Sequence, residues 1–245
     1  TFTDVTASAG VAGCNTCYSS CGLWWDHDRD GDLDLYVSNL NTTNQMYENK
    51  GNGKFENITE ALGIGGGPTI TWASVALDAG KDGFLDLLNV NDTQQKEFFE
   101  NRSGVKYNET ALAYRLNSIG ADMGVTIGDP NHDGLFDIYL TSIFNYEPNS
   151  MFVDLGNRRY ANRAKEWGID DTGWGWGTSF LDFDHDTDED LAAVNGPIDE
   201  VHHAIQPDIE NFFFKNKLVE TGQPGFEDIS KASGTNGLAK SKGLE

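Results

Sequence analysis

The chain has 245 residues, of which 38% are hydrophobic, enough to fill the core of one large domain or two small ones. Acidic residues outnumber basic ones 39 to 17, and the formal net charge of −22 argues against nucleic acid as a partner. Membrane insertion is not expected, because no apolar run reaches the ~18 residues of a membrane span and the first ten residues lack the regions of a signal peptide.

Three cysteines, Cys14, Cys17 and Cys21, lie within eight residues, and the chain has no others. A tetrahedral zinc site is the less favoured interpretation, because it needs four ligands and no second cysteine pair accompanies them. We predict a local disulfide, with one thiol left over or paired to another chain, which is typical of an oxidising compartment. Five Asn-x-Ser/Thr sequons are compatible with secretion and glycosylation. They lie at Asn41, Asn57, Asn91, Asn101 and Asn108.

An internal repeat organises the chain. An aromatic residue that opens a polar, strand-like stretch recurs at intervals of 53, 52, 53 and 66 residues, at Phe2, Phe55, Tyr107, Tyr160 and Phe226. An aspartate that opens an acidic loop recurs independently at intervals of 52, 51 and 53 residues, at Asp26, Asp78, Asp129 and Asp182. Each unit holds about four short strands between Gly, Asn and Asp turns, and no segment shows a sustained helical period.

These units predict an all-β fold, a β-propeller of four-stranded blades. Four strands of this kind cannot bury both faces of their sheet alone, so copies must stack, and radial stacking protects their edges. We predict a single propeller domain or propeller fragment over residues 1–245, with repeats at about 2–54, 55–106, 107–159 and 160–225 and a partial fifth at 226–245. The longer fourth unit places its extra residues between Asn195 and Asn211, in a surface loop.

The four acidic loops have the spacing of oxygen ligands around calcium. In DHDRDGDLD, positions 1, 3, 5 and 9 carry carboxylates, position 6 is glycine and position 7 offers its carbonyl. Hard oxygen donors in a flexible loop suit Ca²⁺ better than Mg²⁺. We expect up to four calcium ions. The predicted ligands are Asp26, Asp28, Asp30, Asp32 and Asp34; Asp78, Asp82, Phe84 and Asp86; Asp129, Asn131, Asp133, Leu135 and Asp137; and Asp182, Asp184, Asp186, Asp188 and Asp190, where Asp32, Phe84, Leu135 and Asp188 occupy position 7.

Two loops depart from this pattern. The second has Gly80 where the position-3 oxygen should be, with Lys81 beside it, so it should bind calcium most weakly. The fourth has Thr187 at the glycine position, where a left-handed backbone costs roughly 1–2 kcal/mol unless the turn changes. The loop histidines stand at positions that are not ligands, and we expect them to point to solvent. They are His27, His132 and His185.

Two other interpretations of the loops fit less well. An EF-hand is excluded because position 12 is not glutamate and the flanks alternate like strands. Position 12 is Val37, Asn89, Leu140 and Ala193 in the four loops. Solvated hairpin turns would explain one Asp-Gly cluster. Four copies would each hold like charges close together, and neighbouring carboxylates about 4 Å apart repel by roughly 1 kcal/mol even in water.

The stretches MGVTIGDPNHDGLFDIYLTS, GWGWGTSFLDFDHD, AAVNGP and FEDISKASG carry a family resemblance. Together with the tandem loops they resemble the FG-GAP or VCBS repeats of integrin-like propellers, and most closely the ASPIC/UnbV and cartilage acidic protein group. The resemblance implies a calcium-binding, secreted or surface-displayed propeller that binds other macromolecules. It also implies about seven blades, so we expect a fragment of a larger ring. A small closed ring, or open sheets that pair with further blades or another chain, are the alternatives.

The favoured function is a non-catalytic extracellular scaffold or recognition module with a protein or glycan partner. One alternative is a glycan-active lyase or hydrolase, in which His202 and His203 beside Asp199 and Glu200 act as general acid and base. Another is a lectin whose tryptophans stack on sugar rings, although beside strands we expect these side chains in the core. The tryptophans are Trp24, Trp25, Trp174 and Trp176.

Overall fold

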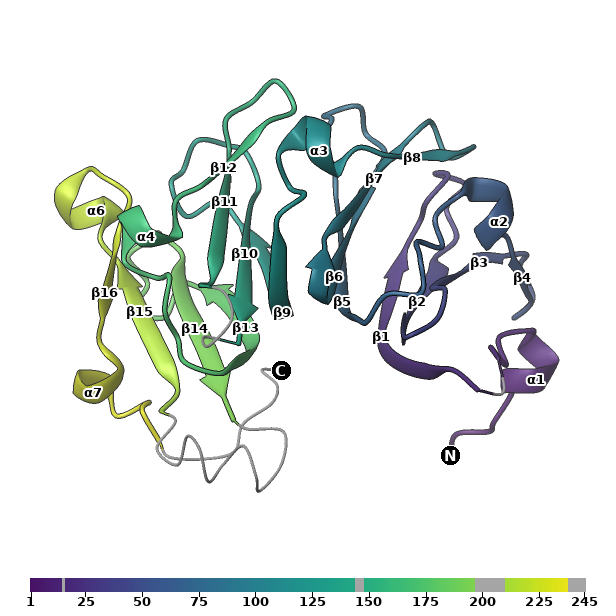
Figure 1. Ribbon diagram of the computed structural model, residues 1–245, viewed down its shortest axis with the longest axis horizontal. Coiled ribbons are helices and arrows are strands. Elements are labelled where there is room, and N and C mark those ends of the chain that lie inside the picture. The colour runs from purple at the N-terminus through teal and green to yellow at the C-terminus, as the bar shows by residue number, and fades with distance from the viewer. Residues whose placement is uncertain (15, 144–147, 197–209, 238–245) are drawn as a thin grey trace. The chain divides into compact units, whose positions relative to one another are not determined.

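The computed structural model describes residues 1–14, 16–143, 148–196 and 210–237, and almost all of its regular structure is β (Figure 1). The described strands form blades of four antiparallel strands each, so the predicted all-β fold with four-stranded blades is confirmed. The chain divides into two compact units, residues 1–119 and 120–245.

The first unit contains two blades. In the first blade, strands pair in sequence order: β1 (Tyr18–Trp25), β2 (Asp34–Leu40), β3 (Gln45–Asn49) and β4 (Phe55–Asn57). The second blade repeats this order with β5 (Thr71–Leu77), β6 (Asp86–Gln95), β7 (Glu97–Asn101) and β8 (Tyr107–Glu109). The register sets Asp34 opposite Trp25 and Asp86 opposite Leu77. The acidic loop therefore closes the first hairpin of each blade.

The second unit contains two further blades with the same topology. The third blade consists of β9 (Ile119–Gly128), β10 (Asp137–Ser142), β11 (Ser150–Asp154) and β12 (Tyr160–Asn162). The fourth consists of β13 (Gly175–Leu181), β14 (Asp190–Asn195), β15 (Phe212–Asn216) and β16 (Phe226–Asp228). Asp137 pairs with Gly128 and Asp190 with Leu181, so both acidic loops again close the first hairpin.

The aromatic landmarks of the repeat begin the last strand of a blade, not its first. Phe55, Tyr107, Tyr160 and Phe226 are the first residues of β4, β8, β12 and β16. Phe2 lies in an exposed segment without a strand. The sequence repeat therefore has the correct length, but its boundaries fall one strand before those of the blades, so the last strand of each blade was assigned to the following repeat. Strand β16, which the repeat pattern places in a partial fifth unit, completes the fourth blade.

Short helices, which no pattern in the sequence predicted, follow the last strands. They are α2 (Thr59–Leu62), α3 (Ala111–Tyr114), α4 (Ala164–Trp167) and α7 (Ser230–Ser233), while α1 (Thr6–Ala9) precedes the first blade and α6 (Leu218–Thr221) follows β15. A polar side chain starts several of them: the Asn57 carboxamide oxygen accepts the Thr59 N–H at 3.1 Å. Left-handed Gly63 ends α2. One turn is too short to show a helical period.

Each unit buries a core between its two blades. In the first unit the core contains Trp25, Tyr36, Met46, Leu62, Ile64, Leu87, Phe99 and Tyr107; in the second it contains Tyr139, Met151, Val153, Ala164, Trp167, Ile169, Leu191 and Phe214. The Tyr36 hydroxyl donates to the Ile64 carbonyl at 3.1 Å, and Tyr139 makes the equivalent bond to Ile169 at 2.9 Å. Within each unit the apolar face of one blade is therefore covered by the other, as stacked repeats require.

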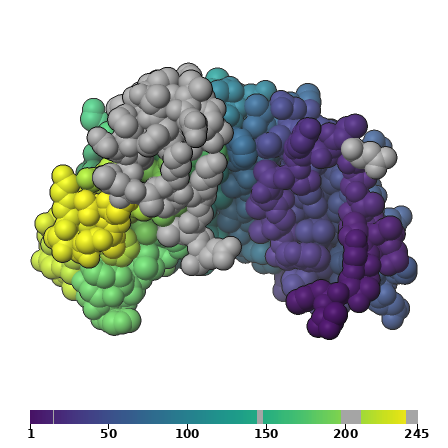
Figure 2. All heavy atoms as spheres, turned by 90° about the horizontal axis from the view of Figure 1, so that it is seen from below, coloured from purple at the N-terminus to yellow at the C-terminus, as the bar shows by residue number. Residues whose placement is uncertain are grey.

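The N-terminal residues, dark purple in Figure 2, form part of the surface of the first unit. Cys14 and Cys17 form a disulfide and Cys21 is a free, half-buried thiol, as predicted. Among the sequons, Asn91 and Asn101 are fully buried and cannot carry a glycan in the folded protein. The sequons at Asn41, Asn57 and Asn108 are exposed. None of the described helices is long and apolar enough to cross a membrane.

Candidate metal centres

The aspartate at position 9 of each acidic loop is the first residue of the second strand of its blade. Its Oδ1 accepts the backbone N–H of the last residue of the third strand, at 2.8 Å in all four blades. The pairs are Asp34 with Asn49, Asp86 with Asn101, Asp137 with Asp154 and Asp190 with Asn216. These four carboxylates are 0–1% exposed. The strands therefore hold one ligand of each predicted site rigidly in the protein interior.

The aspartate at position 1 organises the turn of its own loop. In the first loop, Asp26 accepts the N–H groups of Asp30 at 3.1 Å and Gly31 at 3.0 Å. The other loops repeat both bonds at 2.8–3.2 Å, from Asp82 and Gly83 to Asp78, from Asp133 and Gly134 to Asp129, and from Asp186 and Thr187 to Asp182. The backbone is left-handed at position 6, as predicted for a glycine, and also at position 4, which the sequence did not reveal. Position 4 is Arg29, Lys81, His132 and His185.

The predicted ligands converge to different degrees. Carboxylate oxygens of Asp26, Asp28 and Asp34 lie within 4.8 Å of one another, and so do those of Asp182, Asp184 and Asp190. In every loop the carboxylate at position 5 accepts the N–H of position 7, at 2.9–3.2 Å. These bonds place Asp32 beside Asp30, Phe84 beside Asp82, Leu135 beside Asp133 and Asp188 beside Asp186.

The third loop supplies an amide at position 3. The Asn131 carboxamide oxygen accepts the Asp133 N–H at 3.1 Å, and its NH₂ group donates to the Asp133 carboxylate at 3.1 Å. The side chains of Asn131 and Asp133 thus hold the turn of this loop together. The carboxamide oxygen of Asn131 and the carboxylate of Asp133 lie near the turn, where they can bind a cation.

Burial makes the position-9 carboxylates costly to ionise. Desolvation raises the pKa of Asp86 to about 7, that of Asp137 to about 8 and that of Asp190 to about 6, and nearby acidic side chains add to each shift. Burial also raises the pKa of Asp34. A buried carboxylate is stable as an anion only when a positive charge or several hydrogen-bond donors face it. A divalent cation near these carboxylates could supply that positive charge.

The third loop differs from the other loops at one atom, Oδ2 of its position-9 aspartate. In the other loops Oδ2 of the position-9 aspartate accepts the N–H of position 2, from His27 at 3.0 Å, Ala79 at 3.1 Å and Phe183 at 3.1 Å. Position 2 of the third loop is Pro130, which has no N–H. Oδ2 of Asp137 is accordingly buried without a hydrogen-bond partner among the described residues. An unpartnered, buried carboxylate oxygen beside Asp129 and Asp133 fits a bound cation.

The second loop is partly neutralised by the protein. Oδ2 of Asp86 accepts a further N–H, from Gly80 at 3.3 Å, so backbone donors surround this carboxylate. The Arg29 guanidinium reaches over from the first loop and lies 5.3 Å from the Phe84 ring centroid. Together with the missing position-3 oxygen, these groups reduce the need for an ion. They are consistent with the prediction that the second loop binds most weakly.

The fourth loop keeps its geometry despite the threonine. Thr187 has φ 83°, so the turn does not change and the residue adopts the left-handed backbone. The sequence did not reveal Lys215, whose ammonium contacts the position-3 carboxylate of Asp184 and lies 3.2 Å from Asp186 and 2.9 Å from Glu220. The Lys215 ammonium would therefore compete with an ion in this loop for two predicted ligands, Asp184 and Asp186.

One expectation about the histidines is wrong. His27 is only 2% exposed, whereas His132 and His185 are exposed as expected. The His27 backbone N–H donates to the buried position-9 aspartate, Asp34, at 3.0 Å. Trp25 and Trp174 are buried, which agrees with a core role, but Trp24 is half exposed. The candidate acid and base residues His202, His203, Asp199 and Glu200 lie outside the described residues.

Comparison with known families agrees with this architecture. The family model described as FG-GAP-like repeat matches residues 26–89, which run from the first acidic loop through the second and into β6. No curated protein matches the chain. The FG-GAP part of the resemblance is thereby supported. The narrower likeness to the ASPIC/UnbV and cartilage acidic protein group stays a prediction.

Proposed function

We propose that the chain is a calcium-binding, propeller-type recognition module that works outside the cell and has no catalytic role of its own. The observation that carries this proposal is the fourfold-repeated carboxylate cradle, with a buried position-9 aspartate whose second oxygen, in Asp137, has no donor among the described residues. FG-GAP-like repeats suggest a recognition or adhesion module. The loops would then stabilise the blades that present the binding surface.

Calcium suits the cradles better than other common ions. The donors are oxygens from carboxylates, one amide and peptide carbonyls, which suit calcium in a flexible loop, whereas magnesium demands a near-ideal octahedron. In the first loop the ion would be held by Asp26, Asp28, Asp30 and Asp34 with the carbonyl of Asp32. The ion would supply positive charge to carboxylates that burial otherwise disfavours. We propose up to four ions, with the second loop the weakest.

Calcium binding of ordinary affinity would contribute substantially to stability outside cells. With a dissociation constant near 0.1 mM and about 1 mM free calcium, each occupied loop contributes roughly 1.4 kcal/mol to the free energy of unfolding. Several loops would supply a large part of the 5–15 kcal/mol typical of a domain. The Cys14–Cys17 disulfide is also typical of an oxidising, extracellular setting.

The partner is proposed to be a protein or a glycan. A net charge of −22 disfavours polyanions such as nucleic acid and anionic lipid surfaces. The dense carboxylate groups of the described residues are accounted for by the loops and their neighbours, which supports a binding role over catalysis. We also propose that further blades or a second chain could pair with the first and fourth blades.

Thermal unfolding of the metal-free chain with and without calcium tests the proposal. We expect 1 mM Ca²⁺ to raise the melting temperature by roughly 10 °C or more, because 1 kcal/mol corresponds to about 2–4 °C in a chain of this size. The same concentration of Mg²⁺ should have a much smaller effect. A melting temperature that calcium leaves unchanged would contradict the proposal.

A further inference from the structure

The imidazole of His27 is buried and has no hydrogen-bond partner. His27 is 2% exposed, and both ring nitrogens are buried without a partner among the described residues. Its backbone is fixed on both sides, because its N–H donates to Asp34 at 3.0 Å and its carbonyl accepts the Asn101 side-chain amide at 2.9 Å. The main chain of His27 is therefore held in place. A buried polar atom left without a partner costs about 1–3 kcal/mol, so this arrangement calls for a ligand.

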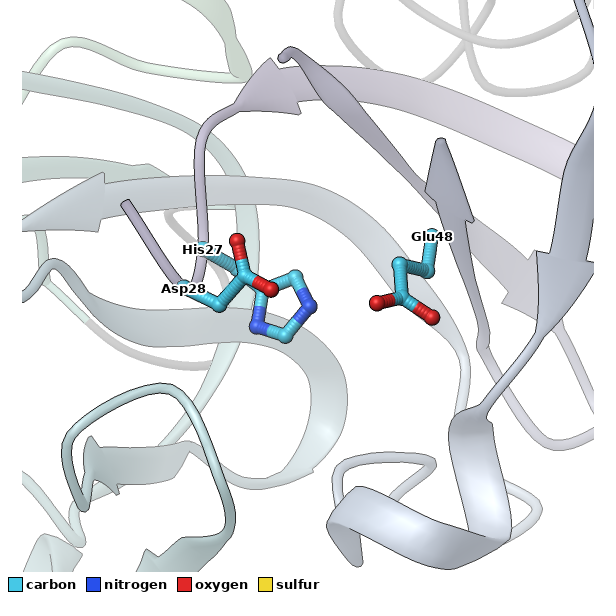
Figure 3. Close-up of side chains that lie close together, drawn as sticks. All are labelled: His27, Asp28 and Glu48. Atoms are coloured by element: carbon cyan, nitrogen blue, oxygen red, sulfur yellow. The ribbon is translucent and has the colours of Figure 1, made fainter. Parts of the chain in front are cut away.

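Two carboxylates face the ring. Figure 3 shows the His27 imidazole between the carboxylates of Asp28 and Glu48, with a ring nitrogen directed toward Glu48. One ligand atom from each of these three residues lies within 4.8 Å of the other two. Nε2 of His27 is 3.9 Å from Oδ2 of Asp34, too far for a hydrogen bond. The histidine comes from the acidic loop and the glutamate from β3, so the sheet itself brings them together.

We propose that His27, Asp28 and Glu48 form a second kind of metal site, for a divalent transition ion of the Zn²⁺ type. One imidazole nitrogen and two carboxylates are three of the ligands that zinc takes in open, three-protein-ligand sites. A nitrogen donor favours such borderline ions over calcium, which takes oxygen. Asp28 also belongs to the cluster with Asp26 and Asp34. Its two oxygens allow it to serve a zinc ion and the loop ion together.

The ion pair between Lys50 and Glu48 leaves one carboxylate oxygen of Glu48 available to a metal ion. The Lys50 ammonium contacts Glu48 and lies 3.4 Å from Glu56, so it is shared between two carboxylates. The Glu48 side chain is 21% exposed, and its second oxygen is left for the ion. This lysine instead limits the negative charge that the metal-free cluster must carry.

The site is specific to the first blade among the described blades. The residues that correspond to His27, at position 2 of the other loops, are Ala79, Pro130 and Phe183, and those that correspond to Glu48 are Glu100, Val153 and Lys215. No other blade combines a histidine with a glutamate at these two places. A zinc-type ion should therefore bind once per chain, whereas calcium-type loops occur four times.

The test measures zinc binding by the full chain in saturating calcium. Calcium should occupy the four acidic loops and leave the cluster of His27, Asp28 and Glu48 free for zinc. Competition with a chromophoric chelator gives affinity and stoichiometry, and Co²⁺ in place of zinc reports ligation through its absorption spectrum. We expect one ion per chain. Glu48→Gln should weaken binding at least about tenfold, whereas Glu56→Gln, which removes the other carboxylate beside Lys50, should leave it unchanged. Glu48 is not a predicted calcium ligand, so calcium binding in Glu48→Gln should stay at the wild-type level.

A second pair of variants isolates the nitrogen ligand. His27→Gln should abolish the Co²⁺ spectrum, and His132→Gln, an exposed histidine of the third loop, should not alter it. If His27→Gln fails to fold, Glu48→Gln still decides the matter. The proposal is overturned if the calcium-saturated chain binds no zinc, if Glu48→Gln binds zinc as the wild type does, or if His132→Gln abolishes binding.

Discussion

The side-chain amide of Asn216 donates a hydrogen bond to the carbonyl of Pro130 at 2.7 Å, just as the amide of Asn101 donates to His27 at 2.9 Å. In each unit, the residue that ends the third strand of one blade thereby holds position 2 of the acidic loop of the preceding blade. The backbone N–H of the same asparagine binds the position-9 aspartate of its own loop. One asparagine therefore ties two acidic loops together.

Replacing Asn101 by its isostere should loosen the first unit. In Asn101→Asp the side-chain donor that now serves His27, Leu85 and Tyr107 becomes an acceptor, while the bond from the Gly104 N–H is kept. The Tyr107 hydroxyl can donate to the new carboxylate, but the His27 and Leu85 carbonyls lose their donor. Unsatisfied buried groups cost about 1–3 kcal/mol each, so we expect at least about 2 kcal/mol less stability in urea unfolding. Asn108→Asp, at an exposed position of β8, is the control and should unfold as the wild type does. Equal stability of the two variants would show that this tie is unimportant.

The fourth loop should gain stability from glycine. Thr187 has φ 83°, a conformation that costs a β-branched residue roughly 1–2 kcal/mol. Thr187→Gly should therefore raise the free energy of unfolding by about 1 kcal/mol, the lower end of that range. The reciprocal change Gly134→Thr should lower it by a similar amount, because a Cβ at Gly134 would meet no atom within 4 Å and only backbone strain is added. Changes of the same sign in both variants would rule out strain at position 6 as the cause.

Much of the fold was predictable from the sequence because short local patterns recur in every repeat. The apolar runs on either side of each acidic loop gave the first hairpin of every blade, and the Asp-Gly spacing placed Asp34 and its three equivalents at the start of the second strands. The phase of the repeat was not predictable in this way. Phe55 and its equivalents pair with the third strand of their own blade, which the repeat pattern had assigned to the preceding unit, and only the strand register reveals that partnership.

The missed features of the site depend on contacts between residues far apart in the chain. Lys215 reaches Asp184 across 31 positions, and Glu48 meets His27 only because β3 lies beside β2. No local pattern distinguishes these side chains from other surface charges. The carbonyl of the buried His27 accepts the side-chain amide of Asn101, 74 positions away. Spacing predicts which atoms can bind an ion, whereas the tertiary fold decides what else competes for them.

Removing the tethered ammonium should strengthen calcium binding in the fourth loop. Lys215 contacts Asp184 and Asp186, two predicted ligands, and its side chain is only 21% exposed. In Lys215→Met these carboxylates lose their cation, so we expect calcium affinity in this loop to rise by about tenfold, equivalent to roughly 1.4 kcal/mol. Isothermal titration calorimetry measures it. Lys217→Met, which loses only contacts with Glu220 and Glu227, should bind calcium as the wild type does. Weaker calcium binding by Lys215→Met would contradict competition between the lysine and the ion.

The third loop offers the sharpest test of why an ion is needed, because Pro130 withholds a single hydrogen bond from Asp137. Pro130→Ala supplies the missing N–H. At about pH 9, above the pKa of about 8 that burial gives Asp137, a hydrogen bond to this charged, buried group contributes about 1.5–3 kcal/mol, whereas the loss of proline costs about 0.4–1 kcal/mol through the unfolded chain. The metal-free variant should therefore be more stable than the wild type by about 1 kcal/mol, the difference between these two effects.

Calcium should reverse that order. Once an ion faces Oδ2 of Asp137, the new N–H adds little, and the entropic cost of losing the proline remains, so Pro130→Ala should be equal to or less stable than the wild type in calcium. Urea unfolding of both proteins in both states gives the four values required. Pro68→Ala, at an exposed position, controls for the proline itself and should be destabilised by the same amount in both states. A gain in Pro130→Ala that calcium leaves undiminished would mean that no ion contacts Asp137.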